Sequence, residues 1–368
     1  MFTAQDQQGK SYTVTRANVG YLKTQQTIYF CQACQEELVI KAGPLKTPHF
    51  AHKCSSKCSF ASEGESERHL NGKWLLADWL LRQSHEISLE HYLKMIARQA
   101  DILVDQKIAV EFQCATIPIS QLIDRTDDYE QVGLQAEWIL GQQLEMCRGR
   151  YHLTAFQKAF IRKHDEWGYH LWCFSVSDQC LRLYYHLTYE GGNRFFASVM
   201  DLPLDWCEAD MKRAVGRIRF RQFYLKQNLQ MERQKTCYYY AKYEAQGNFM
   251  RTLYANGLTL HSLPKEVGIQ LNSQFLVITP AIEWQYQLYV HFFEQFSAGN
   301  LFTKQQIWTC FQKTIQPIKT IYLPKQACRF LLEEYLIYLE KQQVLVQVSE
   351  EKYLFKRMLQ GANWHIDQ

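Results

Sequence analysis

The sequence predicts a multidomain α+β or α/β protein with three parts. Residues 1–60 contain short alternating runs separated by turn residues, as is typical of strands. A helix, three strand-like runs, a second helix and another strand follow in the order αβββαβ. Helical patterns then continue almost to the end. We therefore expect a β-rich module over 1–60, a mixed core over 61–204 and a helical, basic region over 205–368.

Length and composition favour a globular protein with an ordinary core. The 368 residues correspond to two or three domains, and 47% hydrophobic residues exclude a disordered chain. The net charge of +4 is too small to indicate nucleic-acid binding, so any basic surface must be local. No apolar run reaches the roughly 20 residues of a membrane helix. The first residues also lack the pattern of a signal peptide, so we expect a cytoplasmic protein without a membrane partner.

The N-terminal strands are expected at Tyr12–Val14, Ile28–Phe30 and Leu38–Ile40. Among them lies the pattern C-x2-C-x14-H-x2-H, formed by Cys31, Cys34, His49 and His52, with Cys54 and Cys58 just behind. Zinc prefers four nitrogen or sulfur ligands, and a C-x2-C turn directs two thiolates to one point. The alternative is chance clustering in a β-rich segment. We expect structural zinc on Cys31, Cys34, His49 and His52, with Cys58 as the substitute ligand.

The central elements follow from capping and periodicity. Ser62-x-x-Glu65 fits a capping box, and apolar residues continue at helical spacing from Leu70 to Leu80. We then expect strands at Glu86–His91, Ala100–Val104 and Ile108–Phe112, a turn at 105–107, a helix over Ser120–Tyr129 and a strand at Leu134–Leu140. Runs at His170–Val176 and Leu181–Leu187 are expected to extend the sheet.

Carboxylates interrupt these apolar elements in a pattern that suggests chemistry. Glu65, His69 and Lys73 are spaced to share one helix face. Asp101 begins one strand-like run, and Glu111 and Gln113 share a face of the next. Because unpaired carboxylates near a core are costly, a Mg²⁺ ion bound by Asp101 and Glu111 is one explanation. The alternatives are solvated acids at strand edges or ion pairs with Arg98 or Lys107.

Four segments together resemble the competence protein CoiA family. They read IYFCQACQEELVIKAG, EGESERHLNGKWLL, ADILVDQKIAVEFQCATIPISQLIDRTDDY and EWIL, and they occur in one order across about residues 28–140. The resemblance implies a PD-(D/E)xK-type, restriction-endonuclease-like core behind a zinc-finger-like segment. It also implies a role in recombining imported DNA into the chromosome of naturally competent bacteria.

The family pattern assigns roles to particular residues. The helix acid falls on Glu65, with Glu67 as the fallback, and the strand acids fall on Asp101 and Glu111. Gln113 replaces the usual motif lysine, so we expect Lys73 to supply the positive charge from the helix, near His69. Arg125 is expected to contact a phosphate and Tyr129 to pack or stack beside it. An ion pair of Arg125 with an acid near Asp124 or Asp128 is the alternative.

A local basic segment is the expected DNA-binding surface. Residues 211–251 hold ten basic and two acidic residues, among them Arg217, Arg219 and Arg221, interleaved with tyrosines. This composition suits phosphate neutralisation and stacking on unpaired bases. Alternatively, the tyrosines form the buried face of a long helix. Three further helices and a hairpin, near 283–296, 302–314, 323–341 and 344–355, predict a winged-helix-like module that contacts protein or packs internally.

Two functions are consistent with these features. The first is a Mg²⁺- or Mn²⁺-dependent deoxyribonuclease that processes imported single-stranded or branched DNA. The second is a non-catalytic DNA-binding factor that assists a recombinase or its loader. The two differ at Glu111, Gln113 and Lys73, and an intact metal site favours the first.

Overall fold

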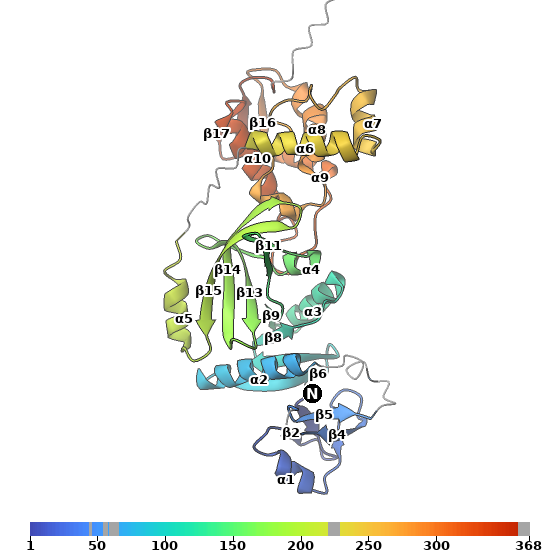
Figure 1. Ribbon diagram of the computed structural model, residues 1–368, viewed down its shortest axis with the longest axis vertical. Helices are drawn as coiled ribbons and strands as arrows, with labels where there is room; N and C mark the ends of the chain where they lie inside the picture. Colours follow the sequence, from blue (N-terminus) through green and yellow to red (C-terminus); the bar gives the residue numbers. More distant parts are fainter. Residues whose placement is uncertain (44–45, 54–57, 59–65, 220–228, 360–368) are drawn as a thin grey trace, which may run out of the picture.

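The computed structural model describes residues 1–43, 46–53, 58, 66–219 and 229–359. Three parts follow one another along its longest axis, as Figure 1 shows. A small N-terminal sheet lies at one end, a large twisted sheet occupies the centre, and a group of helices lies at the other end. Within these described residues, no helix combines the length and apolarity needed to cross a bilayer.

The N-terminal part is a five-stranded antiparallel sheet in the order β2-β1-β3-β4-β5. The predicted strands are all present, and an unpredicted short helix, α1, lies between β2 and β3. Their bounds are β1 Thr3–Gln5, β2 Ser11–Thr13, α1 Val19–Thr24, β3 Tyr29–Phe30, β4 Glu37–Lys41 and β5 His49–His52. Phe50, Ala4 and Val14 form the centre of its small core.

The central part begins with the predicted αβββαβ order. These elements are α2 Glu67–Arg82, β6 Ile87–Leu93, β7 Arg98–Val104, β8 Ile108–Gln113, α3 Ile119–Gln131 and β9 Gln135–Leu140. Strands β6, β7 and β8 are antiparallel, and β9 is parallel to β8. The expected turn at 105–107 is a tight hairpin in which Asp105 and Gln106 both have positive φ.

The sheet then continues through longer strands, as predicted for the runs after residue 170. The remaining elements are β10 Glu145–Cys147, β11 Arg150–His152, α4 Ala155–Lys158, β12 Arg162–His164, β13 Gly168–Ser175, β14 Cys180–Gly191 and β15 Arg194–Pro203. The main strand order is β10-β11-β15-β14-β13-β9-β8-β7-β6. Strand β13 joins the strands β6 to β9 to the strands β10, β11, β14 and β15, because its Cys173 pairs in parallel with Leu140 of β9.

Helices cover both faces of this sheet. Helix α2 packs on one face together with α5 (Glu208–Val215), whose Met211 and Val215 share a core with Leu76 and Phe112. Helices α3 and α4 cover the other face, where Tyr129 and Phe160 pack with Trp138. The division of the chain after residue 204 would place α5 with the C-terminal region, yet its apolar residues are buried against the central sheet.

The C-terminal part contains α6 Leu229–Tyr243, α7 Asn248–Ala255, α8 Ala281–His291, α9 Lys304–Thr314 and α10 Arg329–Lys341. The short 3-10 helices η1 Asn272–Leu276 and η2 Phe293–Gln295 accompany a three-stranded sheet of β16 Leu301–Thr303, β17 Leu345–Ser349 and β18 Lys352–Phe355. Instead of one long basic segment, residues 211–251 contribute to three separate helices. Tyr169 of β13 contacts Ser273 of η1 at 2.7 Å and so links the central and C-terminal parts.

Helix α2 approaches β8 closely at a glycine. A Cβ atom on Gly72 would lie 2.0 Å from Cε1 of Phe112, whose ring is buried. Alanine normally stabilises a helix by about 1 kcal/mol relative to glycine. Here we expect Gly72→Ala to destabilise the protein by about 1–3 kcal/mol, because the added methyl group overpacks the core.

Thermal denaturation of Gly72→Ala measures this effect. Gly20→Ala in α1 is the matched control, because nothing lies within 4 Å of the position of its added Cβ. An unchanged or raised melting temperature for Gly72→Ala would show that the helix can move away from β8 at little cost.

Candidate functional site

Four sulfur and nitrogen ligands converge in the N-terminal part. One ligand atom from each of Cys31, Cys34, His52 and Cys58 lies within 4.8 Å of every other. Cys34 Sγ and His52 Nε2 lie 3.3 Å apart. Ligands of a tetrahedral zinc ion, bound at about 2.0–2.3 Å, are separated by roughly 3.5–3.8 Å. The cluster therefore fits a zinc ion with only small adjustments.

The structure changes one expected ligand of this cluster. His49 and His52 both lie on β5, three residues apart, so their side chains leave opposite faces of the strand. His52 joins the cluster, whereas His49 Nδ1 lies 2.8 Å from the carbonyl oxygen of Thr47. Cys58, the expected substitute, occupies the fourth place, and Cys54 lies outside the described residues.

The electrostatics of the cluster also suit a cation. Burial raises the pKa of Cys31, and it raises the pKa of Cys34 to about 12. Burial lowers the pKa of His52, which keeps the imidazole neutral. Without a metal these groups are protonated thiols around a neutral base. A zinc ion would hold them as thiolates and would release protons on binding.

Helix α2 supplies the next group of candidate residues. Its N-cap is Ser66, whose hydroxyl accepts from the His69 amide, so the helix begins after the predicted capping box. Glu65 lies outside the described residues. The fallback acid, Glu67, accepts hydrogen bonds from the Thr47 amide and hydroxyl, both at 3.0 Å. Glu67 therefore holds the N-terminal part against the helix.

The Asp101 carboxylate contacts two side chains of α2, His69 and Lys73, that were expected to lie near the site. His69 Nε2 lies 3.3 Å from its Oδ2, and Lys73 Nζ lies 3.6 Å from its Oδ1. The strand pairing of β7 with β8 runs as far as Ile102 opposite Val110. Beyond that pair, the backbone amide of Phe112 donates to the Asp101 carboxylate at 2.9 Å. Burial alone would raise the pKa of Asp101, but the charges of His69 and Lys73 outweigh it and lower the pKa.

The ammonium group of Lys73 is shared between two carboxylates. Its nitrogen lies 2.7 Å from Glu90 Oε1, and both side chains are at most 2% exposed. The other oxygen of Glu90 accepts from the backbone amides of Phe2 and Thr3, at 2.5 and 3.1 Å. Glu90 thus ties strand β1 of the N-terminal sheet to the lysine that faces Asp101.

Glu111 lies on β8 and meets helix α3. Its Oε2 accepts from Arg125 at 2.6 Å, and its Oε1 accepts from the Tyr129 hydroxyl. Burial and the charge of Asp101 outweigh these contacts and raise the pKa of Glu111 to about 7. Burial therefore disfavours the charged form of Glu111, and a cation bound beside the carboxylate would favour that form. Each oxygen of the Glu111 carboxylate accepts one of these hydrogen bonds and retains a lone pair with which to coordinate a cation.

The other residues expected to contact DNA or the reacting phosphate differ in how far their side chains are engaged. Arg125 forms an ion pair with Glu111, and its guanidinium lies 5.0 Å from the centroid of the Trp138 ring. It is therefore not available as a separate contact for a phosphate. The Gln113 amide donates to the Ala115 carbonyl at 2.6 Å. Arg217 is exposed, Arg219 donates to the carbonyl of Gly216, and Arg221 lies outside the described residues. Asp101, Glu111 and any third acid, cysteine or histidine of the described chain form no compact ligand group.

The sequence did not predict the role of Glu90, which joins β1 to Lys73. It lies in the strand Ile87–Leu93, which also contains Ser88 and His91, so the residue pattern does not single it out. Its φ of 50° departs from ordinary strand geometry. Neither this backbone conformation nor the contact with β1 is predictable from spacing.

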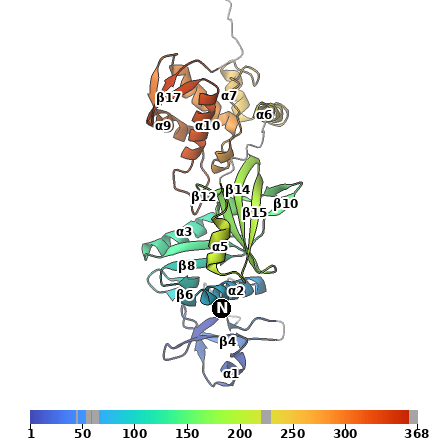
Figure 2. The same cartoon turned by 90° about the vertical axis from the view of Figure 1, so that its left-hand side faces the viewer.

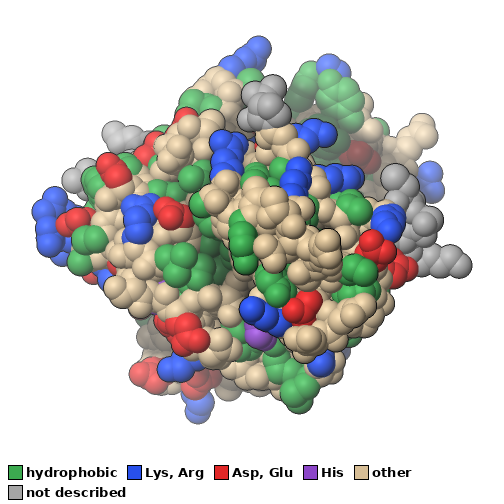
Figure 3. Space-filling view, turned by 90° about the horizontal axis from the view of Figure 1, so that it is seen from below, with side chains coloured by type: hydrophobic (Ala, Val, Ile, Leu, Met, Phe, Trp, Pro, Cys, Tyr) green, Lys and Arg blue, Asp and Glu red, His purple; other side chains and the backbone are tan. Residues whose placement is uncertain are grey.

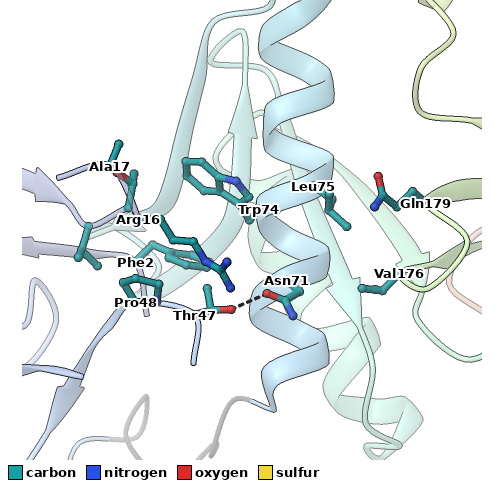
Figure 4. A pocket seen from close by; sticks show the side chains of 12 residues that line it. Phe2, Arg16, Ala17, Thr47, Pro48, Asn71, Trp74, Leu75, Val176 and Gln179 are labelled. Carbon is teal, nitrogen blue, oxygen red and sulfur yellow. Dashed lines mark hydrogen bonds between the residues drawn. The ribbon is translucent and has the colours of Figure 1, made fainter. Parts of the chain in front are cut away.

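A cavity of about 780 Å³ lies where the N-terminal part meets α2. Figure 4 shows Trp74 and Asn71 of α2 on one side and Phe2, Arg16 and Thr47 on the other. Thr47 contacts Asn71 at 2.5 Å across this boundary. Phe2 also lies under the Lys73 ammonium, 5.7 Å from ring centroid to nitrogen. The cavity is thus separated from the Lys73–Asp101 pair by one aromatic ring.

The face of the molecule at the end of the N-terminal sheet does not carry a patch of charges of one sign. Figure 3 views this end, and positive, negative and apolar side chains are interspersed over it. A surface that binds the phosphate backbone along its length would show clustered cations. The face in this view therefore carries no continuous cationic track.

Family models match the chain in three consecutive segments. Residues 11–61, 65–211 and 220–367 match the N-terminal domain, the nuclease-like domain and the C-terminal domain of competence protein CoiA. The chain belongs to the competence protein CoiA family. The nuclease-like segment of the family contains all of α2, β7, β8 and α3, and therefore Lys73, Asp101, Glu111 and Arg125.

A curated relative supports the same family. Competence protein CoiA of Bacillus subtilis (strain 168) is 32% identical over 187 residues, which are 50% of this chain and 50% of that protein. The match thus spans about half the length of this relative. No solved structure matched the chain.

The ligand set of the N-terminal cluster can be tested with two variants. We expect Cys58→Ser to carry less than stoichiometric zinc and to have a protease-sensitive N-terminal part, because it loses one of four ligands. His49→Gln should keep one zinc ion per chain. Metal analysis of the purified proteins measures both. Full occupancy in Cys58→Ser, or loss in His49→Gln alone, would contradict this ligand set.

The shared ammonium group should be important for stability. We expect Lys73→Met to lower the free energy of unfolding by about 3–5 kcal/mol, because it leaves Glu90 and Asp101 buried without their cation. Urea denaturation measures the change. Adding Glu90→Gln should recover part of the loss, so the double variant should be more stable than the sum of the single effects implies.

Arg82→Met is the control on the same helix. Its ion pair with Asp78 is about half exposed, so the expected loss is under about 1 kcal/mol. Strict additivity of the Lys73 and Glu90 effects would show that the two side chains are energetically independent.

Proposed function

We propose that this chain is a Mg²⁺- or Mn²⁺-dependent deoxyribonuclease that processes imported DNA during natural transformation. The observation that carries the proposal is the ion pair of Asp101 with a buried lysine from α2, with a second buried carboxylate, Glu111, on the adjacent strand β8. Membership of a family with a nuclease-like domain supports it. So does the name of the relative from Bacillus subtilis, which points to competence.

The side chains can divide the work of phosphodiester hydrolysis. Asp101 and Glu111 would hold the cation, which supplies Lewis acidity and lowers the pKa of a bound water. Lys73 would stabilise negative charge near Asp101, the role that a motif lysine plays and that Gln113 cannot. His69, 3.3 Å from Asp101 and partly exposed, is placed to orient the carboxylate or to exchange a proton. Arg125 and Tyr129 would fix the Glu111 carboxylate in position.

We further propose a structural zinc ion on Cys31, Cys34, His52 and Cys58. Its fit rests on the donor set and on the 4.8 Å limit among the ligand atoms. We also propose the three-part division into 1–60, 61–204 and 205–368. Helix α5 lies after the second boundary in the sequence but packs with the central part. The β16-β18-β17 sheet with helices α8, α9 and α10 supports a winged-helix-like module at the end.

A second function, a non-catalytic DNA-binding factor that assists a recombinase, is favoured by one observation. Both oxygens of Glu111 already accept hydrogen bonds from Arg125 and Tyr129, so the carboxylate is held without any metal. A chain of this kind would bind single-stranded or branched DNA and would show no cleavage with either cation.

Cleavage assays separate the two functions. We expect the purified protein to cut single-stranded, duplex or branched DNA only with Mg²⁺ or Mn²⁺. Asp101→Asn should reduce the rate by at least about 100-fold, because it removes a charged ligand while an oxygen remains for the Phe112 amide. Product formation on labelled DNA measures the rate, and melting temperatures confirm folding.

Asp105→Asn is the control for this experiment. It makes the same chemical change in the hairpin just after β7, where Asp105 contacts His85. Equal activity in Asp101→Asn and wild type would exclude the proposed site. Absence of cleavage by folded wild-type protein on every DNA form would favour the second function.

A further inference from the structure

Helix α6 presents an unusual exposed face. Lys235, Tyr238, Tyr239 and Lys242 follow the spacing i, i+3, i+4, i+7 and therefore lie on one side of the helix. Tyr243 adjoins them, four residues after Tyr239. The side chains of Tyr238, Tyr239 and Tyr243 are 63%, 49% and 63% exposed. We call Lys235, Tyr238, Tyr239, Lys242 and Tyr243 the α6 stripe.

The opposite face of α6 is what attaches it to the protein. Tyr240 is buried with Phe249 and Met250 of α7, and its hydroxyl donates to Glu283 at 2.6 Å. Arg233 donates to the carbonyl oxygens of Val267 and Leu263. Figure 2 shows α6 end on, at the outer edge of the C-terminal helices. The packing of α6 therefore does not need the stripe.

The side chains of the stripe are arranged as aromatic surfaces with a cation among them. Lys242 Nζ lies 5.6 Å from the centroid of the Tyr238 ring and 5.1 Å from that of Tyr243. The rings of Tyr239 and Tyr243 are 5.4 Å apart. The other cation, Lys235, lies 2.7 Å from Glu232 in an exposed pair, which holds it only weakly.

We infer that the α6 stripe binds single-stranded DNA by stacking bases on its tyrosines and pairing phosphates with its lysines. Exposed aromatic rings interleaved with cations are the combination that single-strand binders use. A duplex hides its base faces, so the stripe should prefer single strands. This inference rests on the proposed function, which makes DNA the substrate, and it names the form of DNA that the C-terminal part holds.

The test is kept independent of cleavage. It uses the full-length Asp101→Asn chain, a fluorescein-labelled oligothymidylate and buffer without added Mg²⁺ or Mn²⁺. Fluorescence anisotropy gives the dissociation constant. The double variant Tyr238→Ala/Tyr239→Ala should bind at least about tenfold more weakly, since each stacked base contributes roughly 1–3 kcal/mol. Lys242→Gln should make the salt dependence of binding shallower by about 0.7 in log–log slope.

Two controls separate stacking from a structural role. Tyr238→Phe/Tyr239→Phe keeps the rings and should bind within about threefold of the parent. Tyr254→Ala removes another exposed tyrosine, on α7, and should change little. Unchanged oligothymidylate binding by the folded Tyr→Ala variant would overturn the inference and leave the stripe as a surface for protein. Equal losses for duplex and single strands, or for the Phe and Ala variants, would also overturn it.

The outcome is distinguishable from that of the proposed function. If wild-type protein cuts no DNA but oligothymidylate binding depends on the α6 stripe, the inference stands and the nuclease proposal falls. If the protein cuts DNA and stripe variants bind normally, only the inference falls.

Discussion

One buried ammonium group connects the N-terminal sheet to the carboxylates of the central sheet. Lys73 is 1% exposed and lies between Glu90 and Asp101. A charge in such a position is tolerated only when its partners and hydrogen bonds are complete, and removing one partner is expensive. The second oxygen of Glu90 completes the arrangement by accepting from the amides of β1. The position of the N-terminal part and the charge state of the site are thereby set by the same three side chains.

The proposed zinc ion would have a role beyond the folding of the N-terminal cluster. It would be bound by His52 of β5, by Cys31 and Cys34 of the turn before β4 and by Cys58, and β1 lies in the same sheet. Loss of a zinc ion there would loosen the sheet whose first strand holds Glu90. The aromatic ring of Phe2, between the junction cavity and Lys73, would be affected as well. A structural zinc ion in the N-terminal part would in this way support the carboxylate site of the central sheet without contacting it.

The sequence predicted the local pattern of the fold better than its long-range contacts. The order αβββαβ, the turn after β7 and the helix face shared by His69 and Lys73 follow from periodicity over a few residues. The exchange of His49 for Cys58 follows equally from strand alternation, once β5 is known to include both histidines. The contact of Glu90 with Phe2 and Thr3 joins residues almost ninety positions apart, and no local rule specifies it. Packing of α5 on the central sheet was missed because the basic stretch that begins within this helix suggested the C-terminal region.

The central claim is that Asp101 and Glu111 share a divalent cation. A crystal of the protein soaked with Mn²⁺ tests it most directly through anomalous scattering. We expect a single strong peak between the two carboxylates, with oxygen ligands at about 2.1–2.2 Å and the Lys73 nitrogen nearby. An empty site at high Mn²⁺ concentration, with Glu111 still bound by Arg125 and Tyr129 alone, would contradict it.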